Sequence, residues 1–172
     1  MNKLDGFTEF VTARLPALTR LGFALTGDHQ LAEDLVQTAL FRLAQRWGRV
    51  DEPQAYARRI MINESTSWRR RRRLRETSLA AAGDPAGTVE VAESVARRES
   101  FIAALRTLTA KQRAVLALRY YEDLSEVDTA AALGCSVGTV KSRTHQAIRR
   151  LRELAPELAI GTDRSLAEEV AR

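Results

Sequence analysis

A chain of 172 residues, with 45% hydrophobic and 28% charged residues, is long enough for one domain or two small ones and is not disordered. Its net charge of +5 favours an anionic partner. Cys135 is the only cysteine, and the histidines His29 and His145 lie far apart in the sequence, so neither an internal disulfide nor a metal or cofactor site is expected. We find no signal segment and no apolar run of roughly 18 to 20 residues, which predicts a cytoplasmic protein without a membrane contact.

The sequence predicts two helices within its first 47 residues. Apolar residues recur at helical spacing over residues 7–25, and Pro16 is expected to kink or divide this helix. Gly27 ends it, and Asp28 is the expected cap of a second helix over residues 28–47. One face of the second helix is apolar, with Leu31, Leu35, Ala39, Leu43 and Trp47. Its opposite face is polar and partly acidic, with Gln30, Glu33, Asp34 and Gln37, which fits either simple solvation or a partner surface.

A third helix, starting near Asp51 and Pro53, becomes strongly basic along its length. It carries Tyr56, Arg58, Arg59 and Asn63, and it ends in Trp68, Arg69, Arg70 and further arginines. The arginines can neutralise phosphates, and the aromatic side chains, with Trp47 upstream, can stack on unpaired bases. The alternative for the aromatic residues is that they belong to the core.

Residues 76–96 are rich in Ala, Gly, Ser, Thr and Val and carry only acidic charges, which is typical of a flexible linker. The predicted fold is therefore all-α, with two small helical domains at residues 1–75 and 97–155 and a short tail at residues 156–172. In the second domain, Thr109 and Gln112 form a capping box at the start of a helix.

A helix-turn-helix is predicted over residues 124–151. Ser125 caps its first helix, Gly134 suits the left-handed position that ends it, and Ser136 caps the second helix. One stripe of the second helix is expected to be buried: Val140, Thr144, Ala147, Ile148 and Leu151.

The other side of this second helix is polar. It presents Thr139, Ser142, Arg143 and Gln146, with Lys141 beside them. Arg and Gln can contact base edges in a major groove, whereas Lys, Ser and Thr mostly hold phosphates. A solvated amphipathic helix is the alternative, but the two caps and the short turn favour DNA binding. Cys135, in the turn, fits a small packing residue or a redox sensor. We find no catalytic constellation, and therefore expect no enzyme.

This arrangement resembles the extracytoplasmic-function sigma factors of bacterial RNA polymerase, and most closely their actinobacterial SigE-like subgroup. Its most specific pieces are AEDLVQ at residues 32–37 and LGCSVGTVKSR at residues 133–143. In this comparison Asp128 and Thr129 stand where bulkier apolar residues are common, which predicts looser packing of the first helix of the turn motif.

The resemblance implies sites on both domains. Region 2 would contact core RNA polymerase through Asp34, Leu35 and Gln37, which favours the partner surface over simple solvation. It would also capture the promoter −10 element through Tyr56, Arg58, Arg59, Asn63, Trp68, Arg69 and Arg70. Region 4 would recognise the −35 element through Thr139, Lys141, Ser142, Arg143 and Gln146.

The expected function is that of an alternative sigma factor, monomeric when free, with core polymerase and promoter DNA as partners and an anti-sigma protein as a further candidate. One rival is a stand-alone helix-turn-helix regulator, which would bind duplex DNA tightly without polymerase and usually as a dimer. The sequence shows no dimerisation heptads. A site-specific recombinase would need a catalytic domain that residues 1–75 do not resemble.

Overall fold

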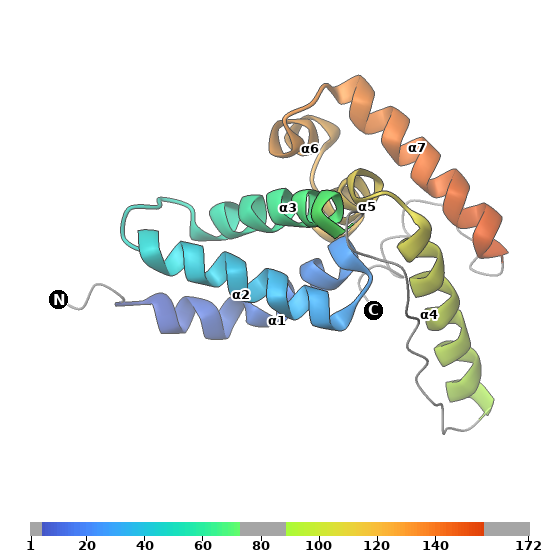
Figure 1. The fold of residues 1–172 in the computed structure, drawn as a ribbon, viewed down its shortest axis with the longest axis horizontal. Coiled ribbons are helices and arrows are strands. Elements are labelled where there is room, and N and C mark those ends of the chain that lie inside the picture. Colours follow the sequence, from blue (N-terminus) through green and yellow to red (C-terminus); the bar gives the residue numbers. More distant parts are fainter. Residues whose placement is uncertain (1–4, 73–88, 157–172) are drawn as a thin grey trace.

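The structure, a computed structural model, describes residues 5–72 and 89–156, and every regular element in these ranges is helical (Figure 1). In chain order the helices are α1 (Phe7–Thr26), α2 (His29–Arg46), α3 (Pro53–Arg72), α4 (Val89–Thr107), α5 (Ala110–Leu116), the π-helical segment η1 (Ala117–Tyr121), α6 (Glu126–Leu133) and α7 (Val137–Leu154). None of the helices within the described ranges has the length and apolar character needed to cross a membrane. The all-α prediction is confirmed.

Helices α1, α2 and α3 pack side by side around one apolar core. Asp28 caps α2 as predicted, because its Oδ1 accepts a bond from the Leu31 N–H at 3.0 Å. A Cβ atom at Gly22 would lie 3.1 Å from the Ala32 carbonyl oxygen, so this glycine allows α1 and α2 to approach closely. Pro16 is exposed and does not divide α1, which continues from Phe7 to Thr26.

The helix-turn-helix forms with the predicted caps. The Ser125 and Ser136 hydroxyls accept bonds from the Asp128 and Thr139 N–H groups at 3.0 and 3.2 Å, and Gly134 ends α6 with a φ of 60°. The capping box of Thr109 and Gln112 is also present at the start of α5. Local side-chain chemistry therefore sets the ends of these helices.

The two predicted domains share a core. Ala114, Ala117 and Leu118 of α5 and η1 are buried in the same apolar cluster as the core residues of α1, α2 and α3. A second cluster joins α4, α5 and α7, and a small third one, made of Val115, Ala130 and Val140, joins α5, α6 and α7. Helix α5 therefore holds the second domain together and also docks it onto the first (Figure 1).

The bounds of the predicted linker need correction. Helix α4 begins at Val89, so residues 89–96 of the segment predicted as linker are helical, and residues 73–88 lie outside the described residues. For Trp47, the structure supports the core alternative over base stacking, in agreement with its place on the predicted apolar face. Its ring packs against Phe7 and Phe10 at centroid distances of 5.2 and 5.4 Å, and its indole N–H donates to the Asp5 carbonyl at 2.8 Å.

Thr129 is a weak point in the packing of α6. Its side chain is fully buried, and its hydroxyl has no hydrogen-bond partner among the described residues. We expect Thr129→Val to raise the free energy of unfolding by about 1 kcal/mol, because valine has nearly the same shape and leaves no hydroxyl unsatisfied. Denaturant unfolding followed by circular dichroism measures this change. Thr139→Val, at a partly exposed threonine whose hydroxyl has a partner, serves as the control, and equal stability of Thr129→Val and wild type would contradict the prediction.

Candidate nucleic-acid interface

Helix α7 separates its buried and exposed residues clearly. Val140, Ala147 and Leu151 are buried, and Thr144 and Ile148 are half-buried on the same side. Of the predicted DNA-contacting residues, Lys141, Ser142 and Gln146 are exposed, and Thr139 and Arg143 are half-buried. Helical spacing therefore places Thr139, Ser142 and Gln146 on the side of α7 away from its core contacts, with Lys141 and Arg143 at the edges of the buried apolar stripe.

The turn holds α7 at a defined angle to α6. Leu133, Cys135 and Val137 pack against the third apolar cluster, which gives Cys135 a packing role in the turn. Lys141 lies 3.5 Å from the Glu126 carboxylate at the start of α6, and the Gln146 amide donates to the Ser142 hydroxyl at 3.4 Å. Both contacts are between exposed groups, so a phosphate or a base edge can replace them at little cost.

On α3 three of the predicted −10 residues, Arg58, Arg59 and Asn63, lie near the second domain. Arg59 and Asn63 are exposed, and they line an open groove of about 480 Å³ together with Arg58. The other wall of this groove is formed by α6 and its turn, at Ala131, Ala132, Leu133 and Gly134. Unlike Arg59 and Asn63, Arg58 is not fully exposed, and its guanidinium pairs with the Glu122 carboxylate at 2.5 Å.

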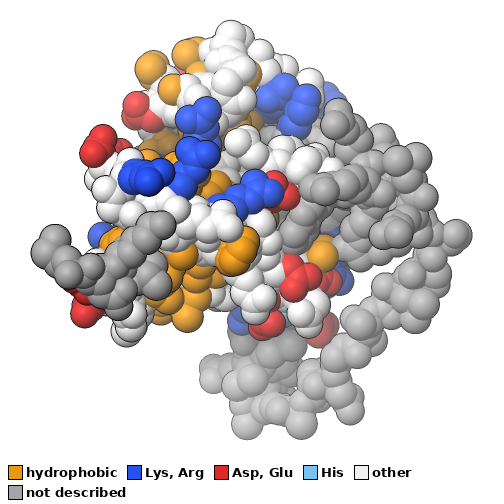
Figure 2. Space-filling model, turned by 60° about the vertical axis from the view of Figure 1, so that its left-hand side comes forward, with side chains coloured by type: hydrophobic (Ala, Val, Ile, Leu, Met, Phe, Trp, Pro, Cys, Tyr) orange, Lys and Arg blue, Asp and Glu red, His pale blue; other side chains and the backbone are white. Residues whose placement is uncertain are grey.

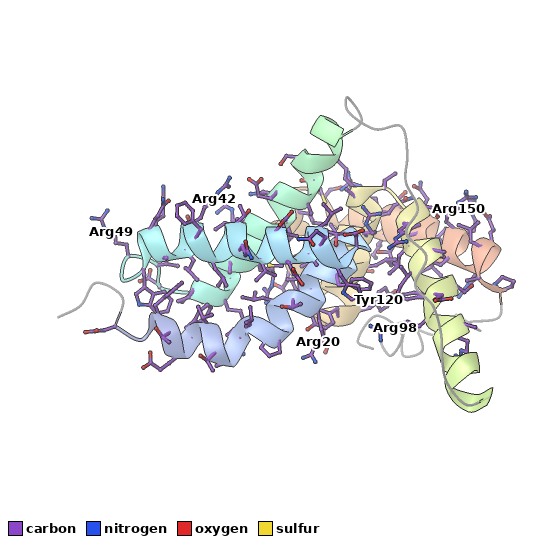
Figure 3. The ribbon with its side chains drawn as sticks, turned by 60° about the horizontal axis from the view of Figure 1, so that its bottom comes forward. Arg20, Arg42, Arg49, Arg98, Tyr120 and Arg150 are labelled. Carbon is purple, nitrogen blue, oxygen red and sulfur yellow. The ribbon has the colours of Figure 1, made fainter. Side chains whose placement is uncertain are left out.

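A separate hollow of about 560 Å³ lies where α2 meets α3. It is lined by Gln45, Arg46, Arg49, Val50 and Tyr56. Figure 3 shows Arg42 and Arg49 pointing outward at this end of the molecule, and Figure 2 shows a face on which Lys and Arg side chains gather. Tyr56 packs against the core and also lines the hollow, whose lining includes Arg46 and Arg49. A basic hollow with an aromatic wall suits an unpaired nucleotide.

Helix α2 carries the predicted polymerase contacts, and one of them is wrong. Asp34 and Gln37 are exposed, but Leu35 is 0% exposed in the core of α1, α2 and α3 and cannot contact a partner directly. Phe41, which the sequence analysis missed, is 66% exposed. Asp34, Gln37 and Phe41 are spaced three and four residues apart, which places them on one side of α2. This spacing is visible in the sequence and could have predicted that Phe41 shares their surface.

Three predicted −10 residues have no described side chain. The backbone of α3 extends through Trp68, Arg69 and Arg70, but their side chains lie outside the described part of the structure. Within that part, no group of His, Cys, Asp and Glu side chains is arranged to hold a metal ion.

A helix-turn-helix with an exposed polar recognition helix, attached to a three-helix domain with a basic hollow, defines a DNA-binding regulator with two helical domains.

Two family descriptions match the chain: sigma-70 region 2 at residues 10–75 and sigma-70 region 4 at residues 98–151. The RNA polymerase sigma-E factor of Streptomyces coelicolor is 41% identical over 156 residues, covering 89% of this chain and 88% of that protein. The ECF RNA polymerase sigma factor SigL of Mycobacterium tuberculosis is 36% identical over 156 residues, covering 83% of this chain and 85% of SigL.

Two solved structures are similar. The sigma factor RpoE in complex with the anti-sigma factor NepR, from Bartonella quintana, has a TM-score of 0.67 at 31% identity, covering 86% of this chain and 95% of RpoE. CnrH in complex with the cytosolic domain of CnrY has a TM-score of 0.55 at 22% identity, covering 88% of each chain, and shows the fold alone.

The chain belongs to the extracytoplasmic-function sigma factors of bacterial RNA polymerase, and it is similar to the sigma-E factors of Streptomyces. It is an alternative sigma factor that directs transcription, and members of this family are regulatory DNA-binding proteins.

Proposed function

We propose that this chain binds core RNA polymerase through α2, captures the unpaired −10 element on α3 and the adjoining basic hollow, and recognises the −35 element in the major groove through α7. It acts in the cytoplasm as a dissociable specificity subunit and itself makes or breaks no bond. Region 2 corresponds to residues 1–75 and region 4 to residues 97–155. The observation that carries the proposal is the exposed polar face of α7, which is anchored by a buried apolar stripe.

Polymerase contact is assigned to Asp34, Gln37 and Phe41 on the exposed side of α2. An exposed aromatic ring beside a carboxylate and an amide has the composition of a binding hot spot. Leu35 supports this surface from the core and does not form part of it. An anti-sigma protein, as seen with RpoE, is a further partner.

On α3 we assign −10 capture to Tyr56, Arg58, Arg59 and Asn63, followed along the helix by Trp68, Arg69 and Arg70. The exposure of Arg59 and Asn63 and the place of Tyr56 in the basic hollow support this assignment. Arginines hold the phosphates, and the aromatic rings stack on bases that have left the duplex. Region 4 contributes Thr139, Lys141, Ser142, Arg143 and Gln146 to the −35 contact.

In vitro transcription with core polymerase on a broad promoter library tests the proposal. We expect start-site-specific transcripts that depend on this chain. Absence of both core binding and specific transcripts would overturn it. Tight binding to a duplex site without polymerase would instead favour the stand-alone regulator.

Arg143 is expected to select a base within the −35 element. Arg143→Ala should relax preference at one position of this element by about 1 to 3 kcal/mol, because an arginine forms two hydrogen bonds with a guanine edge. Transcription from a library randomised at the −35 element measures the preference. Arg98→Ala is the control, since Arg98 is an exposed arginine on α4, outside the proposed −35 surface. A uniform loss across all −35 sequences would show that Arg143 contacts only phosphate.

A further inference from the structure

One ion pair of the helix-turn-helix joins its two helices. The Glu126 carboxylate, in the first turn of α6, lies 3.5 Å from the Lys141 Nζ near the start of α7. The other ion pairs described on α7 are local to that helix, because Arg149 and Arg150 both pair with Glu153. Glu126 is therefore a carboxylate that a second helix brings to a residue of the proposed −35 surface.

The pair is not needed to hold the two helices together. The Ser125 hydroxyl caps α6 and also bonds to the Asp128 carboxylate, so the start of this helix is fixed without Glu126. Helices α6 and α7 are joined by the third apolar cluster, which contains the buried residues Val115, Ala130 and Val140. Packing and capping therefore leave the Glu126 carboxylate without a structural role that only it can fill.

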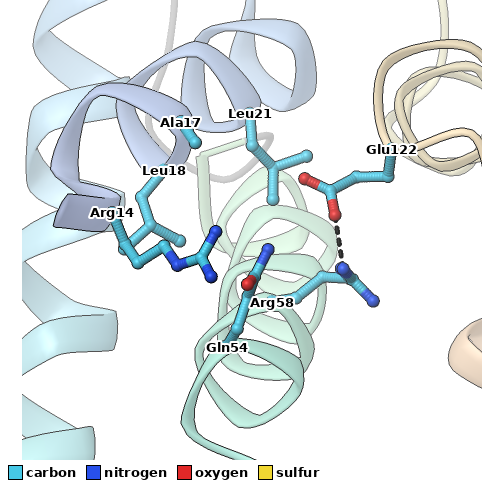
Figure 4. A pocket seen from close by; sticks show the side chains of 7 residues that line it. All are labelled: Arg14, Ala17, Leu18, Leu21, Gln54, Arg58 and Glu122. Carbon is cyan, nitrogen blue, oxygen red and sulfur yellow. Dashed lines mark ion pairs between the residues drawn. The ribbon is translucent and has the colours of Figure 1, made fainter. Parts of the chain in front are cut away.

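The exposure of the pair allows it to exchange partners. The side chains of Lys141 and Glu126 are 63% and 39% exposed, and ion pairs with this exposure contribute little to stability. The pair of Arg58 and Glu122 differs, because both of its side chains are largely buried and face each other between helices (Figure 4). Only the exposed pair lies where an incoming anion can reach its cation.

Duplex DNA brings such an anion. Lys141 is a proposed phosphate contact, and an ammonium group that binds a phosphate lies about 2.8 Å from its oxygen atom. While Lys141 keeps its position, that phosphate comes within roughly 6 Å of the Glu126 carboxylate. Two negative charges at this separation repel each other, because it is shorter than the Debye length of about 8 Å at physiological ionic strength. The DNA backbone and Glu126 therefore compete for one ammonium group.

We propose that Glu126 limits the affinity of region 4 for duplex DNA by competing with a backbone phosphate for Lys141. Glu126 acts through Lys141 and does not itself touch DNA, so it is a positioning residue of the −35 contact. The inference rests on the proposed function of α7 and adds a residue that sets the strength and the salt dependence of its DNA contact.

Removing this carboxylate strengthens DNA binding, and this sign separates the inference from a structural role. A carboxylate in the first turn of α6 stabilises the helix through its dipole. If Glu126 served only the fold, its loss would loosen the helix-turn-helix and weaken binding. A gain in affinity follows only from competition with DNA.

The test compares the wild-type full chain with Glu126→Gln, which removes the charge and keeps the shape of the side chain. Fluorescence anisotropy with a labelled DNA duplex of mixed sequence measures the affinity, since phosphate contacts do not depend on sequence. We expect Glu126→Gln to bind about threefold more tightly at low salt. Its plot of log affinity against log salt concentration should be steeper by about one, because Lys141 then displaces one further counterion from the DNA.

A Lys141→Met background shows whether Glu126 acts through the lysine. Lys141→Met alone should weaken binding and make the salt dependence shallower by about one. In that background we expect Glu126→Gln to give no gain. A threefold gain that persists without Lys141 would overturn the inference, because the carboxylate would then repel DNA directly.

Glu99→Gln is the matched control. Glu99 is exposed on α4, outside the proposed −35 surface, and the substitution removes the same charge. We expect it to bind like the wild type, and an equal gain from Glu99→Gln would show that only net charge matters. Glu126→Ala, which favours a helix, is the second variant and should reproduce the gain if Glu126→Gln does not fold.

An affinity of Glu126→Gln at or below the wild-type value would overturn the inference, as would an unchanged salt dependence. Failure of the proposed function gives a different result, because it is measured on the wild-type chain as loss of core polymerase binding and of specific transcripts. The duplex measurements contain no polymerase and do not depend on those results.

Discussion

Asp34→Arg is expected to abolish binding to core RNA polymerase while leaving the fold intact. Asp34 is exposed on α2, and its carboxylate forms no ion pair within the described residues, so the fold does not depend on its charge. At the polymerase interface, however, an arginine repels the groups that attract the carboxylate, which weakens the binding free energy by several kcal/mol. Pull-down with core polymerase measures binding, and a thermal melt measures the fold.

Glu99→Arg is the matched control for this prediction. It makes the same charge change at an exposed position on α4, outside the proposed polymerase surface. We expect it to retain binding. If Asp34→Arg bound as well as the wild type, the assignment of α2 as the polymerase contact would be wrong.

Arg113→Met is expected to lower the free energy of unfolding by about 3 kcal/mol, the largest change in stability that we anticipate for this chain. Arg113 is buried in α5, and its guanidinium donates to the carbonyls of Leu25, Leu105 and Leu108 at 2.8, 3.1 and 3.0 Å. These carbonyls lie at the ends of α1 and α4, where helices lack internal donors and favour positive charge. Methionine has a similar length and supplies no donor.

Denaturant unfolding followed by circular dichroism measures this loss. Lys111→Met provides the control, since Lys111 is exposed on the same helix and carries the same charge. We expect its stability to stay within about 0.5 kcal/mol of the wild type. Equal stability of Arg113→Met and the wild type would show that water replaces the guanidinium at no cost.

The proposed surfaces differ in how far the sequence predicted them. On α7, helical spacing separated Val140 and Leu151 from Ser142 and Gln146, and the structure buries the first pair and exposes the second. On α2 the same spacing placed Leu35 in the core, but the family resemblance led us to assign it to the polymerase contact. Its burial shows that a family motif combines surface residues with the core residues that position them.

Phe41 on α2 and Trp47, its C-terminal cap, are aromatic residues in opposite environments. Trp47 and Phe41 are both large and apolar, yet Trp47 packs against Phe7 and Phe10 whereas Phe41 is exposed. The residue type alone does not show which of the two rings is buried. Only the position of each ring relative to the packed face of the helix distinguishes a core residue from a contact.

The sequence by itself determined where the helices of the turn motif begin and end, because Ser125, Gly134 and Ser136 act on backbone groups within three or four residues of themselves. Only the tertiary structure decided how the two domains meet. Arg113 reaches Leu25, Glu122 reaches Arg58, and Tyr121 reaches Ala17, across long separations in the chain. Such contacts depend on which helix faces pack together, and no local pattern specifies their partners.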